Sequence, residues 1–100
     1  MYEMKQLKKL GQLSELAPEA MKQFQAFSQA VFAEGEIPEK YKELIAVAVA
    51  VSKQCVYCME VHKKNAKKAG ANETEIAEAV FVASAIGAGA SVTHGTHLID

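Results

Sequence analysis

The apolar segment LIAVAVAV, residues 44–51, constrains the fold more than any other feature of the sequence. It follows Pro38, a residue that suits the first turn of a helix, so we expect a helix over roughly 38–53. The second half of that helix is apolar on every side. Such a helix is typically buried at the centre of a protein, so other elements must surround it. The run is too short to cross a bilayer, which takes about 20 apolar residues.

The rest of the chain also carries helix signals. Strand-like alternation and the Asn-Gly or Asp-Gly turns of β-hairpins are lacking. The leucine spacing predicts a weak helix or turn-rich arm over residues 1–16, and Pro18 predicts the first turn of a helix that reaches about residue 34. A further helix is expected to begin near the cysteines and to end at Gly70.

The sequence NETE then predicts the start of a fifth helix. Asn72 is the expected N-cap, and Glu75 three residues later completes a capping box. We expect this helix to end before the small-residue segment SAIGAGAS, residues 84–91. That segment is expected to pack closely against another helix, and a short final helix is expected to carry residues 91–99. The fold class is therefore all-α, a bundle of about five to six helices.

Length and composition predict one domain over residues 1–100 that associates with copies of itself. Half of the residues are apolar, and a chain of this size cannot bury so much apolar surface alone. The net charge of -1 argues against nucleic-acid and anionic-membrane partners. The N-terminal sequence does not resemble a signal peptide, so we expect a cytoplasmic protein. Structural disulfides are rare there, so a pair of nearby cysteines favours catalysis or metal binding.

Both cysteines lie in the segment SKQCVYCMEVHKKNAKKAG, residues 52–70. On a helix that begins near Cys55, Cys58 lies about 60° away and His62 about 20° away, so the three share one stripe. A helix N-terminus favours the thiolate over the thiol. A thiolate attacks peroxides and disulfides, and a second nearby cysteine closes a disulfide. His62 is placed to accept a proton from Cys58.

Glu43 is a carboxylate at the head of an apolar helix face, which it shares with Val47 and Ala50. A buried carboxylate is costly unless it is paired or hydrogen-bonded. If the two helices are antiparallel neighbours, Glu43 can hold the imidazole of His62 and pass protons on. A carboxylate in the first turn can also serve only to complement the helix dipole.

The combination E43-x11-C55-x-Y-C58-x3-H62, followed by AxxxG and a capped helix, resembles the alkylhydroperoxidase D-like group of the carboxymuconolactone decarboxylase superfamily. The resemblance covers a core of about residues 37–95. It implies an all-helical protein that assembles as a homotrimer or homohexamer and reduces hydroperoxides with a dithiol. It further implies that Cys58 attacks the peroxide, Cys55 resolves it, and Glu43 with His62 relays protons. The electron donor would be an external lipoyl-type or thioredoxin-type dithiol, with no bound cofactor.

The sequence departs from that group in two respects. Full-length alkylhydroperoxidase D chains carry an additional related helical half, whereas this chain has a single core. The position between the cysteines is often histidine there and is Tyr57 here, and a phenol is not a base near neutral pH. The decarboxylases of the superfamily lack the cysteine pair, which argues against decarboxylation.

Several alternatives stay open at the level of sequence. Cys55 and Cys58 could join His62, or His94 and His97, in a four-ligand zinc site. A redox-switched structural oligomer without turnover would use the same cysteines. Tyr57 and His94 are candidate contributors to a pocket, but packing for Tyr57, and capping or subunit contact for His94, are the favoured interpretations. The basic segment KKNAKK, residues 63–68, is a solvated face or a docking site for an acidic reductant protein.

Overall fold

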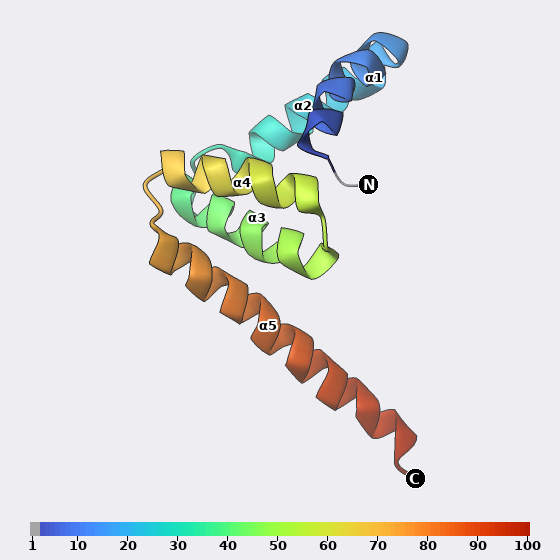
Figure 1. Cartoon of the computed structure of the whole chain (residues 1–100), viewed down its shortest axis with the longest axis vertical. Coiled ribbons are helices and arrows are strands. Elements are labelled where there is room, and N and C mark those ends of the chain that lie inside the picture. Colours follow the sequence, from blue (N-terminus) through green and yellow to red (C-terminus); the bar gives the residue numbers. More distant parts are fainter. Residues whose placement is uncertain (1–2) are drawn as a thin grey trace. The chain divides into compact units, whose positions relative to one another are not determined.

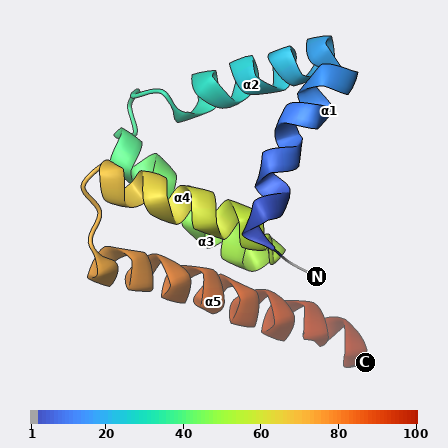
Figure 2. The same ribbon diagram turned by 45° about the horizontal axis from the view of Figure 1, so that its top comes forward.

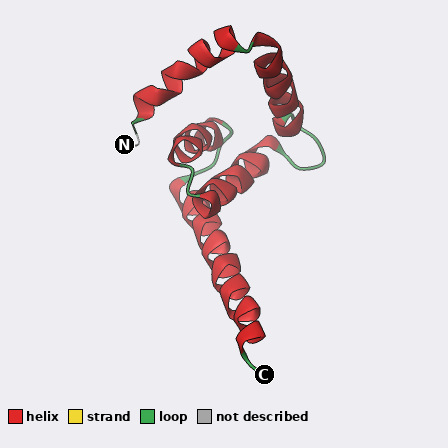
Figure 3. Ribbon diagram, turned by 90° about the vertical axis from the view of Figure 1, so that its right-hand side faces the viewer, coloured by secondary structure: helices red, strands yellow, loops and turns green. Residues whose placement is uncertain are grey.

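The computed structural model describes residues 3–100, and in that range every regular element is helical (Figure 3). The predicted all-α class is therefore confirmed. The elements follow one another along the chain as Figure 1 shows: η1 Met4–Lys9, α1 Leu10–Leu16, α2 Pro18–Phe32, α3 Glu39–Lys53, α4 Val56–Lys68, α5 Glu73–Gly95 and η2 Thr96–Leu98. The weak helix expected at the N-terminus is a 3₁₀ turn followed by α1; its first two residues, Met1 and Tyr2, lie outside the described range.

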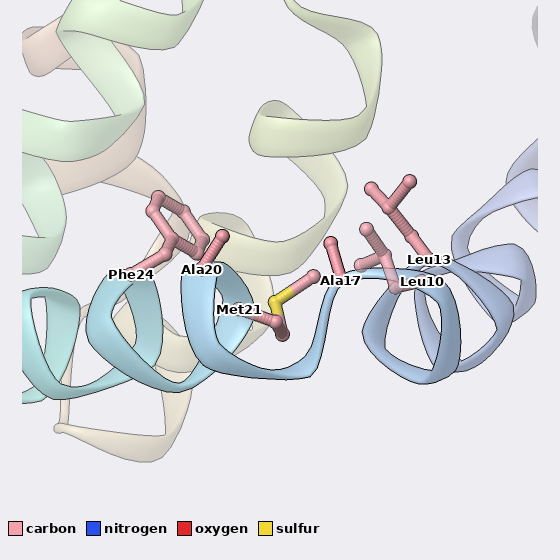
Figure 4. A pocket seen from close by; sticks show the side chains of 6 residues that line it. All are labelled: Leu10, Leu13, Ala17, Ala20, Met21 and Phe24. Atoms are coloured by element: carbon pink, nitrogen blue, oxygen red, sulfur yellow. The ribbon is translucent and has the colours of Figure 1, made fainter.

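Two compact units make up the chain, one ending at Glu39 and one spanning Lys40–Asp100. In the first unit, Pro18 occupies the first turn of α2, as its fixed backbone angle favours. An open apolar groove of about 390 Å³ lies along α1 and α2 (Figure 4). The side chains that line it are Leu10, Leu13, Ala17, Ala20, Met21 and Phe24. The carboxylate of Glu34 accepts the N–H of Glu39 at 2.8 Å and so caps the start of α3.

The second unit is built on α3 and α4, which lie side by side in Figures 1 and 2. Its buried apolar residues are small: Val47 and Ala50 on α3, Ala66 on α4, and Ala71 in the loop that follows. Small side chains let helix backbones approach closely. The opposite face of α3 is open, because Ile45 and Val49 are each about half exposed. The expectation that α3 is buried on every side therefore does not hold within a single chain.

The capping box predicted at the start of α5 is present. Asn72 Oδ1 accepts the N–H of Glu75 at 2.8 Å, and Glu75 Oε1 accepts the N–H of Asn72 at 3.0 Å. The other carboxylate oxygen of Glu75 pairs with Lys40 Nζ at 2.8 Å, which ties the start of α5 to the start of α3. This hydrogen bond from Lys40 lowers the pKa of Glu75, and the same bond raises the pKa of Lys40.

The structure corrects the predicted end of α5. The helix does not stop before residue 84; it continues through the small-residue segment to Gly95, and only a 3₁₀ turn follows. Alanine favours helix strongly enough to offset the cost of about 1 kcal/mol for each interior glycine, and no proline interrupts the segment. The hydroxyl of Ser84 donates to the carbonyl of Val80, one turn earlier, instead of ending the helix.

The second half of α5 projects away from α3 and α4 (Figure 1). Its large apolar side chains Ile86 and Val92 are exposed, and so is Phe81 in the first half of the helix. By length and composition alone, Glu73–Leu98 is the one helical segment in the described range that is long and apolar enough to cross a membrane. Central helices of soluble proteins meet the same criterion, but they are mostly buried, and this segment is not.

The capping box predicts the result of one substitution. Asn72→Ala should lower the free energy of unfolding by about 1 kcal/mol, because the N–H of Glu75 loses its acceptor. Urea denaturation followed by circular dichroism measures the change. Thr74→Ala, in the same helical turn, is the matched control and should not destabilise the protein. An Asn72→Ala protein as stable as the control would contradict the capping role.

Candidate active site

A tight turn places Cys55 directly at the N-terminus of α4. The chain leaves α3 through Gln54, whose φ of 56° lies in the left-handed region that residues other than glycine rarely adopt. The N–H of Gln54 donates to the carbonyl of Val51, and the N–H of Cys55 donates to the carbonyl of Ala50. Cys55 then adopts an extended conformation and becomes the N-cap of α4. The sequence analysis missed the role of Gln54, since nothing in its side chain signals a positive φ.

Cys55 and Cys58 form a disulfide, with Cα atoms 5.3 Å apart. The expectation that these cysteines come within reach of each other is thus met. Cys58 lies in the first turn of α4, and its backbone N–H donates to Cys55 Sγ at 3.2 Å. Both cysteines are half-buried. The pair therefore sits where amide donors and the positive end of the helix dipole stabilise negative charge on sulfur.

Glu43 and His62 meet across the contact between α3 and α4. Glu43 Oε1 lies 2.6 Å from His62 Nδ1, and the carboxylate side chain is only 6% exposed. With the carboxylate ionised, Nδ1 carries the proton that is donated to it. This arrangement fixes the plane of the ring and favours the tautomer in which Nε2 is the basic nitrogen. The contact expected from the sequence is present, and its part in proton transfer belongs to the proposal below.

Three of the four lysines of the basic segment on α4 pair with neighbouring carboxylates. Glu60 pairs with Lys63 at 3.3 Å and with Lys64 at 3.6 Å, and Glu73 pairs with Lys67. The hydrogen bond from Lys63 lowers the pKa of Glu60, and the hydrogen bond from Lys67 lowers the pKa of Glu73. The side chains of the paired lysines are about half exposed or more, so they lie on a solvated face of the helix.

The other residues singled out from the sequence occupy different positions. Tyr57 lies in the first turn of α4 between the two cysteines and is half-buried. His94 lies in the last turn of α5, and its ring packs edge-on against His97 with centroids 5.1 Å apart. None of the contacts described for the two cysteines, Glu43 and His62 involves His94. Over residues 3–100, no group of three or more His, Cys, Asp or Glu side chains is arranged to hold a metal ion.

The sequence pattern of the carboxymuconolactone decarboxylase family matches residues 18–100. This chain belongs to that family. The match begins at the first residue of α2 and therefore includes the cysteine pair, Glu43 and His62. The identification made from the spacing of these four residues is confirmed at the level of the superfamily.

Relatives and solved structures agree with the family assignment. The uncharacterized protein 4 in the cox locus of Paracoccus denitrificans is 42% identical over 85 residues, which are 85% of this chain and 77% of that protein. An uncharacterized protein of Cupriavidus necator is 35% identical over 82 residues, 82% of this chain and 73% of its own length.

Two crystal structures share the fold. A Methanobacterium thermoautotrophicum protein superposes with a TM-score of 0.83 at 36% identity, covering 88% of this chain and 99% of its own. A carboxymuconolactone decarboxylase family protein of Legionella pneumophila, in its apo form, gives a TM-score of 0.78 at 33% identity, covering 90% of this chain and 80% of its own.

The contact between Glu43 and His62 predicts how the reduced thiols titrate. In His62→Ala, the pH profile of thiol alkylation should move up by about one unit, or about tenfold in rate near neutral pH, because a nearby base is lost. Glu43→Gln should move the profile in the same direction by a smaller amount. The rate of alkylation of fully reduced protein by iodoacetamide, measured against pH, gives this profile. His94→Ala is the matched control. Superimposable profiles for His62→Ala and the wild type would contradict a role for the imidazole.

Proposed function

We propose that this protein is a thiol-dependent peroxidase, or more broadly a disulfide oxidoreductase, that reduces hydroperoxides through Cys55 and Cys58. One observation carries the proposal. A disulfide-forming cysteine pair begins α4, and a histidine one turn later on that helix is held by a buried carboxylate. Membership of the family supports this reading only in general terms, because the family comprises more than one kind of chemistry.

The proposed cycle begins at Cys58. His62 takes the proton of the Cys58 thiol, and the thiolate attacks the terminal oxygen of a hydroperoxide. The oxygen–oxygen bond breaks, the alcohol leaves with the proton, and Cys58 becomes a sulfenic acid. The sulfur of Cys55 then attacks Cys58 Sγ, water leaves, and the disulfide closes. Each turnover thus consumes one hydroperoxide and oxidises two thiols.

Glu43 has two tasks in this cycle. It orients the ring of His62 for proton exchange with the sulfur, and it stabilises the imidazolium that forms when the thiol is deprotonated. The carboxylate is buried and lies 2.6 Å from the ring, so both effects act at short range with little water between the two groups. Tyr57 is proposed as a packing residue with a hydrogen-bonding hydroxyl rather than as a catalyst.

Electrons must return to the disulfide from an external dithiol of the lipoyl or thioredoxin type. The dithiol reduces Cys55 and Cys58 and leaves as a disulfide. No bound cofactor is needed for this exchange, because thiolate and disulfide react directly with each other.

We further propose that the protein works as a homo-oligomer, a trimer or a hexamer. The support comes from α5, which carries no charged side chain between Glu78 and Asp100 and exposes its apolar side chains in the single chain. A helix that is apolar all round belongs in a protein interior. The exposed Ile45 and Val49 on α3 add to the apolar surface that copies of the chain would cover.

Intact-mass measurement tests the dithiol cycle directly. One equivalent of an organic hydroperoxide, added to fully reduced protein under native ionisation, should remove two hydrogens per chain and leave no bound metal. The rate of peroxide turnover should fall at least about 10²-fold in Cys58→Ser and in Cys55→Ser, since neither variant can close the disulfide. His97→Ala is the control and should turn over normally. Retained zinc without oxidation, or full turnover in either serine variant, would contradict the proposal.

Size-exclusion chromatography with light scattering measures the mass of the assembly and so tests the proposed oligomer. The wild type should have the mass of three or six chains. Ile86→Lys places a charge on the exposed apolar part of α5, so it should lower the mass towards that of one chain. Glu78→Lys, on the same helix at a position that is already charged and exposed, is the matched control and should keep the assembly. A wild type of one-chain mass at all concentrations would contradict the oligomer.

A further inference from the structure

The two sulfurs of the disulfide are not equivalent. Cys55 is the N-cap of α4, and its Sγ accepts the backbone N–H of Cys58 at 3.2 Å. Cys58 lies inside the first turn of the helix, on the stripe that leads to His62. The helix N-terminus therefore supports negative charge on Cys55 with an amide hydrogen bond that is already formed in the oxidised state.

This difference bears on how the disulfide is reopened. A thiolate attacks one sulfur of a disulfide and expels the other, and the exchange is faster when the expelled thiol has the lower pKa. A helix N-terminus is one of the settings that lower a cysteine pKa. Both cysteines are half-buried. The stability of the expelled thiolate differs between the two directions of attack, and it favours expulsion of Cys55.

We propose that the external reductant attacks Cys58 Sγ and that Cys55 leaves as a thiolate at the N-terminus of α4. This assignment rests on the proposed dithiol function and goes beyond it by naming the sulfur that binds the reductant. The bond between the two protein sulfurs breaks, its electron pair stays on Cys55, and a new bond joins the reductant sulfur to Cys58.

The second step of the exchange releases the oxidised reductant from Cys58. The remaining thiolate of the external dithiol attacks its own sulfur in the mixed disulfide, and the electron pair of the broken bond goes to Cys58. His62 receives one proton from the dithiol and passes it to Cys58, while Cys55 stays a thiolate held by the amide of Cys58 and the second proton goes to solvent. The dithiol loses two electrons and two protons, and the protein gains both electrons and one of the protons. Cys58 is thus the sulfur that meets both the peroxide and the reductant, and Cys55 reacts only with Cys58.

Which sulfur the reductant attacks can be determined without any peroxide. Oxidised wild-type protein is mixed briefly with glutathione, quenched in acid, and alkylated with N-ethylmaleimide at mildly acidic pH. Trypsin should release residues 54–63 as one peptide, and Val56 and Tyr57 between the cysteines allow fragment ions to assign each group. We expect glutathione on Cys58 and maleimide on Cys55, in at least tenfold excess over the reverse at the earliest times. The reverse pattern, an even mixture, or a disulfide that glutathione does not open would overturn the assignment.

Single-cysteine variants test independently whether the start of α4 stabilises the thiolate of Cys55. In Cys58→Ser, Cys55 keeps the backbone N–H of residue 58, so its alkylation should show a lower apparent pKa than an unperturbed cysteine. His62→Ala should slow the release of the mixed disulfide yet keep glutathione on Cys58 in the mapping experiment. An ordinary pKa for Cys55 would contradict the inference. Failure of the intact-mass experiment with hydroperoxide would instead contradict the peroxidase proposal, so the two failures are distinguishable.

Discussion

The buried carboxylate of Glu43 is the constraint on which the site depends. A carboxyl group that is only 6% exposed needs a close partner, and the ring of His62 provides it at 2.6 Å. That contact joins α3 to α4, because the two residues come from different helices. It also sets the ring orientation that the proposed proton transfer requires. One short polar contact therefore links the packing of the second unit to its chemistry.

The turn between α3 and α4 supplies the other half of the site. Gln54 adopts a positive φ, which is unfavourable for a residue with a side chain, and such local strain is often found at functional sites. The turn leaves no loop between the helices beyond Gln54 and Cys55, so the cysteine pair begins the new helix directly. The N-cap bond to Cys55 and the placement of Cys58 one helical turn before His62 both follow from this geometry.

The single chain leaves much of its apolar surface uncovered. Among residues 3–100, the buried apolar side chains are one valine and three alanines, whereas the apolar groove of the first unit, the outer face of α3 and most of α5 are open. Interiors of stable domains are larger and closely packed. Association of copies through these surfaces is the simplest way for such a chain to form an adequate core, which is why assembly and function are proposed together.

By itself the sequence determined the helical class, the boundaries of α3 and α4 within about three residues, the capping box at Asn72 and the stripe that joins the cysteines to His62. These features depend on local rules: proline position, capping side chains and the 3.6-residue period of the helix. The end of α5 was predicted wrongly, since small residues are compatible with both a break and a continued helix. Only the tertiary structure decided that Glu43 meets His62 and that Gln54 turns the chain so that Cys55 caps α4. Contacts between helices and positive φ angles arise from packing and chain closure, which no local pattern of residues encodes.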